Sequence, residues 1–163
     1  MKLQDRDVDI INYIEEYGAT IQQIADLFFA GSYESSNKRL RKLEKDKFIK
    51  GKLHPVLNKK VYYKRKLPSY HSLAIQDVYI LNRDIIQSYK REAKLDKYKV
   101  DALIITKRNN VVIVEIDIWN KTKKEKIDAV KQYVKSRLHC EPYFLILNKD
   151  DIQRGEAKRL PTE

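Results

Sequence analysis

The chain has 163 residues, with 34 Lys and Arg against 23 Asp and Glu, and 42% of its residues are hydrophobic. This length suits one domain or two very small ones, and the apolar content is enough for a buried core, which argues against wholesale disorder. A single cysteine excludes a disulfide framework and a multi-cysteine zinc site, no glycine-rich nucleotide motif occurs, and no apolar run approaches the roughly 20 residues of a membrane-spanning helix.

Cysteine usage and the polar N-terminus indicate the cellular compartment. One thiol is typical of a reducing cytosol, and the first ten residues contain no apolar signal core. We therefore expect a cytoplasmic protein without a membrane partner.

The positive surplus of +11 is confined to residues 37–66. That stretch holds 13 basic residues and two acidic ones, so the rest of the chain is electrically balanced. A concentrated basic patch is the electrostatic footprint of a polyanion-binding protein, because each neutralised phosphate releases counterions. The alternative is a solvated lysine-rich face without a partner.

Apolar periodicity predicts three helices and then a β-hairpin in the first 66 residues. The first helix ends at Gly18, and Thr20 caps the second. Leu40 and Leu43 face inward in the third helix, which is basic. The loop of the hairpin contains His54, which we expect to be solvated. The expected helices and strands cover residues 4–16, 21–30, 33–46, 48–52 and 60–66.

This order of elements resembles the winged helix-turn-helix domain of many bacterial regulators and replication proteins, which places its third helix in the major groove of duplex DNA. Asn suits adenine, Arg suits guanine, and Ser suits either a base or a phosphate, while the basic residues further along are suited to phosphates. A winged helix that makes only protein contacts is the alternative. The candidate DNA-binding residues are Ser35, Ser36, Asn37, Lys38, Arg39, Arg41, Lys42, Lys59, Lys60 and Lys64.

Pro68 and Ser69 separate a second part of the chain, which predicts a small α/β unit. Its expected elements are a helix over 71–87, an extended piece over 88–94, strands over 99–106 and 111–119, a helix over 121–138 and a strand over 143–147. The last residues, 155–163, are expected to fray. The sequence thus predicts an α+β protein with a winged helix-turn-helix over 1–67, an α/β domain over 70–148 and a polar tail over 149–163.

Acidic residues stand inside otherwise apolar strands of the second part. Glu115 and Asp117 share one strand face, and pairing of the neighbouring strands is expected to bring Asp101 near Glu115. Ionised carboxylates in a strand core are costly unless they are paired or bind a metal. Converging carboxylates suit Mg²⁺, which can activate water for phosphodiester hydrolysis. An exposed face of an edge strand is the alternative, because acids there discourage edge pairing.

The runs VDALIIT and VVIVEIDIW resemble the central motif of the PD-(D/E)XK nuclease fold. The resemblance implies a Mg²⁺ site formed by Asp101 and Glu115. The family has a lysine two residues after the glutamate, where this chain has Asp117, so Lys126 or Lys131 on the following helix would supply the amine. If the domain is active, the candidate catalytic residues are Glu92, Asp101, Glu115, Asp117 and Lys131.

Over most of residues 5–147 the chain is similar to the replication-relaxation family of plasmids, phages and integrative elements, which joins a winged helix to a nuclease-like domain. The pieces that carry this similarity are His71, Leu73, Asp77, Val78, Glu92, residues 100–103, residues 115–117, Lys131 and Tyr133.

This similarity implies a DNA-binding protein that acts in replication, relaxation or transfer of a mobile element. Its expected partners are double-stranded DNA, a second copy in a homodimer, and replication or transfer proteins. The nuclease-like domain is expected to serve assembly without a cofactor. Two alternatives remain open, namely a Mg²⁺-dependent PD-(D/E)XK endonuclease and a transcriptional repressor.

Overall fold

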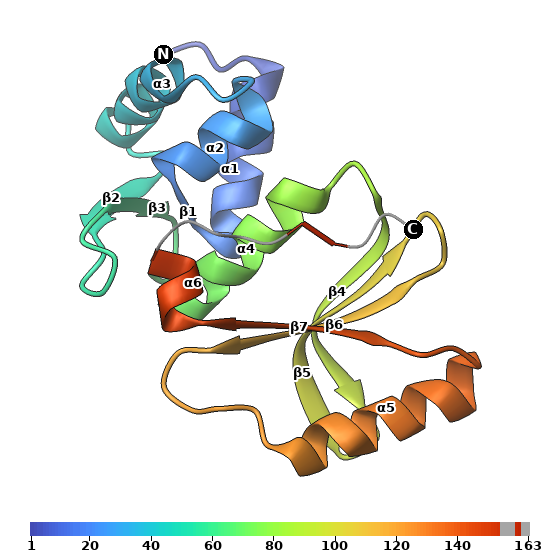
Figure 1. Cartoon of the computed structure of the whole chain (residues 1–163). Coiled ribbons are helices and arrows are strands. Elements are labelled where there is room, and N and C mark those ends of the chain that lie inside the picture. Colours follow the sequence, from blue (N-terminus) through green and yellow to red (C-terminus); the bar gives the residue numbers. More distant parts are fainter. Residues whose placement is uncertain (154–158, 161–163) are drawn as a thin grey trace. The chain divides into compact units, whose positions relative to one another are not determined.

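The computed structural model describes residues 1–153, 159 and 160, and its mixture of helices and two sheets confirms the predicted α+β class (Figure 1). The chain divides into two compact units, Met1–Gln76 and Asp77–Glu163. The division lies inside a helix, α4 (Tyr70–Asn82), further along the chain than the boundary expected near residues 67–70.

The first unit consists of three helices and a small antiparallel sheet. Its strands have the order β1-β3-β2, and the two-residue strand β1 has no counterpart among the predicted elements. In chain order the elements are α1 (Asp5–Tyr17), β1 (Ala19–Thr20), α2 (Ile21–Phe28), α3 (Tyr33–Lys45), β2 (Lys50–Leu53) and β3 (Lys60–Tyr63).

Local chemistry sets the helix ends in this unit. The Thr20 hydroxyl accepts a hydrogen bond from the Gln23 amide at 3.1 Å, and the Gln23 side chain accepts one from the Thr20 amide, which forms a capping box at the start of α2. Gly18 ends α1 with φ 67° and ψ 161°, a conformation available almost only to glycine. A Cβ atom there would lie 2.6 Å from Cγ of Pro68, so this position also requires the absence of a side chain.

The core of the first unit joins all three helices to the sheet. Ile10 and Ile14 of α1, Ile24 of α2, Leu40 of α3 and Tyr62 of β3 are fully or almost fully buried and belong to one apolar cluster. Burial of an aliphatic side chain of this size contributes about 1.5–3 kcal/mol to folding. The packing therefore holds α3 by one side only and leaves its other side to solvent.

The loop between β2 and β3 is built around His54, so the expectation that this residue is solvated is wrong. The His54 ring is buried, and its Nε2 lies 3.1 Å from the carbonyl oxygen of Pro68. Its Nδ1 accepts hydrogen bonds from the amides of Val56 and Leu57 at 3.2 and 3.3 Å. The ring thus replaces water as the partner of loop amides, which a turn-like sequence does not reveal.

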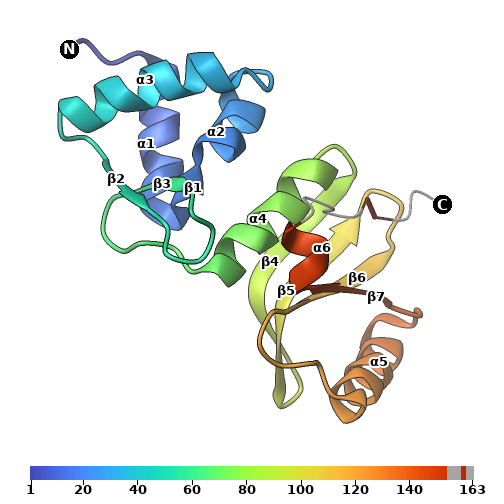
Figure 2. The ribbon, with the colours of Figure 1, turned by 60° about the vertical axis from the view of Figure 1, so that its left-hand side comes forward.

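The second unit is a four-stranded sheet with the order β4-β5-β6-β7. The β6–β7 pair is parallel and the other two pairs are antiparallel. Helix α5 lies against one face of the sheet (Figure 2). On this face Val130 and Val134 pack in a cluster with Val111 and Ile113. Besides the end of α4, the elements are β4 (Ile86–Leu95), β5 (Tyr98–Thr106), β6 (Val111–Asp117), α5 (Lys124–Leu138), β7 (Tyr143–Asn148) and α6 (Lys149–Gln153).

Two expectations for this unit are corrected. Helix α4 ends at Asn82 instead of continuing to residue 87, because Ile86 begins the ten-residue strand β4, which pairs with β5 at eight positions. In the predicted frayed tail, Leu160 is buried and its amide donates to the Asn82 side chain at 2.8 Å. The rest of that tail, apart from Arg159, lies outside the described residues.

In the part of the chain that the structure describes, no helix combines the length and the apolar composition needed to cross a membrane.

Candidate nucleic-acid interface and carboxylate cluster

Helix α3 has one buried side and one basic side. Ser36, Leu40 and Leu43 recur at helical spacing and are fully buried. On the opposite side the side chains of Ser35, Lys38, Arg41, Lys42 and Lys45 are exposed, and Asn37 is half-buried. None of the ion pairs found among the described residues involves these four basic side chains, so their charges face solvent.

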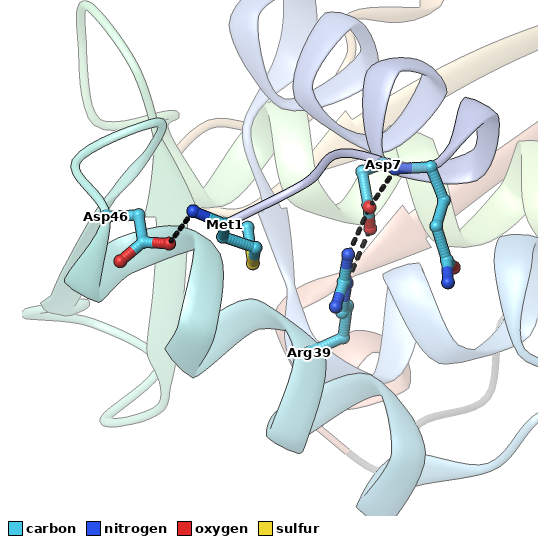
Figure 3. Close-up of polar contacts among 5 residues, drawn as sticks. Met1, Asp7, Arg39 and Asp46 are labelled. Carbon is cyan, nitrogen blue, oxygen red and sulfur yellow. Dashed lines mark hydrogen bonds and ion pairs between the residues drawn. The ribbon is translucent and has the colours of Figure 1, made fainter.

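The carboxylate of Asp7 on α1 is buried, and Arg39 of α3 reaches over to pair with it (Figure 3). The Arg39 Nε donates to Oδ1 of Asp7 at 2.6 Å, and a terminal nitrogen of the same guanidinium contacts Oδ2. The amide of Gln4 donates to Oδ2 at 2.7 Å. The hydrogen bond from Arg39 is the main reason that the pKa of Asp7 lies below its usual value, against the opposing effect of burial.

A second contact joins α3 to the beginning of the chain. The amino group of Met1 lies 3.7 Å from a carboxylate oxygen of Asp46, the residue that follows the last turn of α3 (Figure 3). The Asp7–Arg39 pair thus joins α3 to α1, and the Met1–Asp46 contact joins the residue after α3 to the segment that precedes α1.

Two of the candidate base-reading residues have structural roles in this arrangement. The Ser36 side chain is buried, and its hydroxyl donates to the carbonyl oxygen of Ile21 at 3.1 Å. The Arg39 guanidinium neutralises Asp7. Both groups are engaged within the first unit, because the Ser36 hydroxyl points toward α2 and the Arg39 guanidinium points toward α1. Two features of the sequence agree with this pairing. An aspartate lies in the first turn of α1, and α3 is rich in basic residues.

The candidate cations of the β2–β3 hairpin differ in their contacts, since two of them form ion pairs and one is exposed. Lys60 pairs with Glu44 at 2.6 Å, and Lys64 pairs with Glu15 at 3.0 Å. Lys59 lies in the loop and is exposed. Ion pairs at the surface are weak, so Lys60 and Lys64 are able to exchange their carboxylate partners for phosphates, whereas Lys59 needs no exchange.

In the second unit, strand pairing brings Asp101 and Glu115 together. Ala102 of β5 is opposite Val114 of β6, and the Asp101 carboxylate accepts a hydrogen bond from the amide of Ile116 at 2.7 Å. Glu115 is buried on the face that α5 covers. Burial, with a further contribution from the Asp101 charge, raises the pKa of Glu115 to about 7, although Lys126 acts in the opposite direction.

Lys126, in the first turn of α5, is the basic partner of this pair of acids. Its Nζ lies 2.6 Å from Oε1 of Glu115, in an ion-pair contact without the alignment of a good hydrogen bond. Lys131, the other lysine considered for this role, lies over the ring of Phe144 with its Nζ 5.9 Å from the ring centroid. Of the two lysines, Lys126 therefore occupies the place next to the glutamate.

The remaining acids in the candidate set point elsewhere. Asp117 accepts hydrogen bonds from the amide and the hydroxyl of Thr122 at 2.8 and 2.6 Å and so shapes the loop before α5. The Glu92 side chain is 72% exposed and pairs with Lys99 at 3.0 Å. Within residues 1–153, 159 and 160, no three His, Cys, Asp or Glu side chains are grouped to hold a metal ion.

Comparison of the chain with family models, curated proteins and solved structures found no match.

We predict that Arg39→Ala lowers the free energy of unfolding of the first unit by about 3 kcal/mol, because it leaves the buried Asp7 carboxylate without its cation. Arg41→Ala is the matched control, and since its side chain is exposed the expected change is within about 0.5 kcal/mol. Urea unfolding followed by circular dichroism measures both. Equal stabilities of the two variants would contradict a structural role for the pair.

The same pair predicts acid sensitivity. The folded-state pKa of Asp7 is below the unfolded value of 3.8, so the stability that its ionised form provides is present above that pH and is lost as the pH falls through the folded-state pKa. Asp7→Asn should remove this part of the acid-induced loss in urea midpoints measured down to pH 2.5.

The raised pKa of Glu115 predicts the opposite dependence of folding stability on pH. Its pKa is raised from 4.5 to about 7 in the folded protein, so the associated stability is fully present below pH 4.5 and declines as the pH rises toward 7. Urea midpoints measured between pH 4.5 and 7.5 should fall less steeply for Glu115→Gln than for the unchanged protein. Glu125→Gln, an exposed change in the same helix turn as Lys126, should leave the slope as it is.

Proposed function

We propose that the protein binds duplex DNA through the exposed basic side of α3 and the β2–β3 hairpin. One observation carries the proposal. The stretch that holds the entire positive surplus, residues 37–66, coincides with α3, β2, β3 and their connections in a single unit. A surplus concentrated in one part of a protein produces a local positive potential, which attracts a polyanion and weakens as salt rises.

The shape of the first unit supports the same proposal. An α-helix with its side chains is about 10–12 Å across and fits the major groove of B-DNA, which is about 12 Å wide. Helix α3 is held to its own unit by one side, so the side with Lys38, Arg41, Lys42 and Lys45 remains open for this contact. Among the side chains suited to reading bases, Ser35 and Asn37 lie near the start of the helix and are not buried.

The second unit supports a proposal about the biological process in which this DNA binding takes place. A winged helix joined to a nuclease-like α/β domain is the arrangement of replication-relaxation proteins, and the resemblance extends to Asp101, Glu115 and Asp117. We therefore propose that the protein acts in the replication, relaxation or transfer of a mobile element. In this proposal the second unit serves assembly with a second copy or with replication or transfer proteins, because its acids are engaged within the fold.

The DNA-binding proposal predicts a reduced salt dependence when cations are removed from α3. Arg41→Gln combined with Lys42→Gln should lower the slope of log K against log salt by about two, since each phosphate contact contributes about 0.9. The measurement is fluorescence anisotropy with a labelled duplex between 50 and 300 mM salt. Both side chains are exposed, so the fold should not change.

The matched control is Lys107→Gln combined with Arg108→Gln, in the turn between β5 and β6. These side chains are also exposed, and the change in net charge is the same. The control should keep the slope of the unchanged protein. Affinity that does not fall with salt, or equal slopes for the two double variants, would contradict the proposed interface.

A metal-dependent nuclease is the second candidate, supported by the contact between Asp101, Glu115 and Lys126. Mg²⁺ often binds through one or two carboxylates together with waters and substrate phosphates, so these two acids fit such an ion provided that Lys126 releases Glu115. A bound Mg²⁺ would supply an activated water and charge stabilisation at a phosphodiester. Lys126 would then be free to stabilise negative charge on the substrate.

Nicking of supercoiled plasmid in the presence of Mg²⁺ or Mn²⁺ tests this candidate. If the second unit is a nuclease, Asp101→Asn and Lys126→Gln should each reduce the rate at least 100-fold, whereas Lys131→Gln should retain it. If it serves assembly, none of the proteins should cut above background. A cut that survives Asp101→Asn would come from a contaminant.

A further inference from the structure

A groove of about 510 Å³ lies in the first unit between one flank of α3, the first turn of α1 and the end of α2. Its lining includes Arg6, Phe29, Ser35, Lys38, Arg39 and Lys42, and every charged residue of the lining is basic. The Asp7 carboxylate, next to Arg6 in the chain, is buried and paired with Arg39. The lining of the groove is therefore cationic.

Arg6 is the part of this groove that the charge distribution of the sequence did not indicate. Its guanidinium carbon lies 4.3 Å from the centroid of the Phe29 ring. Such cation–π stacking covers one face of the guanidinium and leaves its N–H edges available. The Phe29 ring thus favours a stacked orientation of the Arg6 guanidinium beside the groove.

Four residues of α3 line the groove from the other side, and three of them are not engaged with Asp7. Ser35, Lys38 and Lys42 follow each other at intervals of three and four residues, so they form one stripe along the flank of the helix. A helix that nearly fills the major groove has its flanks beside the two sugar–phosphate strands. The stripe therefore lies where one strand of a bound duplex would pass.

We propose that this groove seats a short sugar–phosphate segment of one DNA strand, with Arg6 and Lys42 on its phosphates. The proposal rests on the proposed function and adds α1 to the interface. The volume of the groove, about 510 Å³, exceeds that of a single phosphate and suits a phosphate with the adjoining sugars. The stacked Arg6 presents a planar fork of donors, which matches phosphate oxygens in bidentate geometry.

The experiment measures the salt slope of duplex binding for Arg6→Gln, with Lys2→Gln as the matched control. Both side chains are exposed in the same unit, and both changes remove one charge. Arg6→Gln should lower the slope by about one, and Lys2→Gln should leave it unchanged. Phe29→Leu keeps the charge of Arg6 but removes its stacking partner, so it should weaken binding about two- to fivefold at every salt concentration without changing the slope.

The outcomes separate this inference from the proposed function. If the unchanged protein binds duplex with a steep salt dependence and Arg6→Gln keeps the full slope, the groove does not hold the backbone although the DNA interface stands. If the unchanged protein does not bind duplex, both proposals fail. Titration with dAMP forms a third arm. Saturable binding that depends on Arg6, with no effect of Arg6→Gln on duplex binding, would overturn the backbone assignment in favour of a free nucleotide.

Discussion

The buried carboxylate of Asp7 constrains how the first unit can use α3. An ionised group without water needs a cation, and the structure supplies Arg39 from the helix that has to be positioned. The burial of Leu40 and Leu43 sets the rotation of α3 about its own axis, and in this rotation Arg39 points at α1. The same rotation turns Lys38, Arg41, Lys42 and Lys45 toward solvent. One arginine of the basic stretch is thus used inside the fold, while these four cations stay exposed.

The cations of residues 37–66 consequently differ in their contacts, which the composition of this stretch does not show. Part of its charge is balanced within the fold, by Asp7 against Arg39, by Glu44 against Lys60 and by Glu15 against Lys64. The buried pair is fixed, whereas the two hairpin pairs lie near the surface, where exchange with phosphate costs little. Arg6 acts in the other direction, since it adds a cation to the basic side from outside the stretch. The surface potential follows from these contacts rather than from the count of lysines and arginines.

The elements that periodicity can define were predicted well, and the elements set by tertiary contacts were not. The helices near α1, α3 and α5 and the strands β5 to β7 follow from apolar spacing. Apolar spacing does not predict strand β1, because two residues have no period. It places the end of α4 too far along the chain, because Ile85 continues the helical spacing although it lies in the turn before β4. The sequence does not predict that His54 is buried, since only the fold brings the Pro68 carbonyl to its ring. In the candidate sites, the sequence identified Asp101 with Glu115 and the exposed cations of α3, but long-range contacts decided the roles of Ser36, Arg39 and Asp117.

The carboxylate cluster shows why residue identity alone leaves its chemistry open. Glu115 sits in an apolar strand, so its environment has to provide a proton, a metal ion or an ammonium group. With a pKa near 7, the carboxylate carries a proton in part of the molecules at neutral pH. In the others, the ammonium group of Lys126, with its Nζ at 2.6 Å, is the partner of the ionised carboxylate. A metal ion would compete with both, and its affinity would rise as the proton leaves. Asp117 does not contribute, because Thr122 already holds its oxygens. Whether the second unit is a scaffold or a catalyst therefore depends on how readily Lys126 moves, a property of the first turn of α5 and not of the strands that carry the acids.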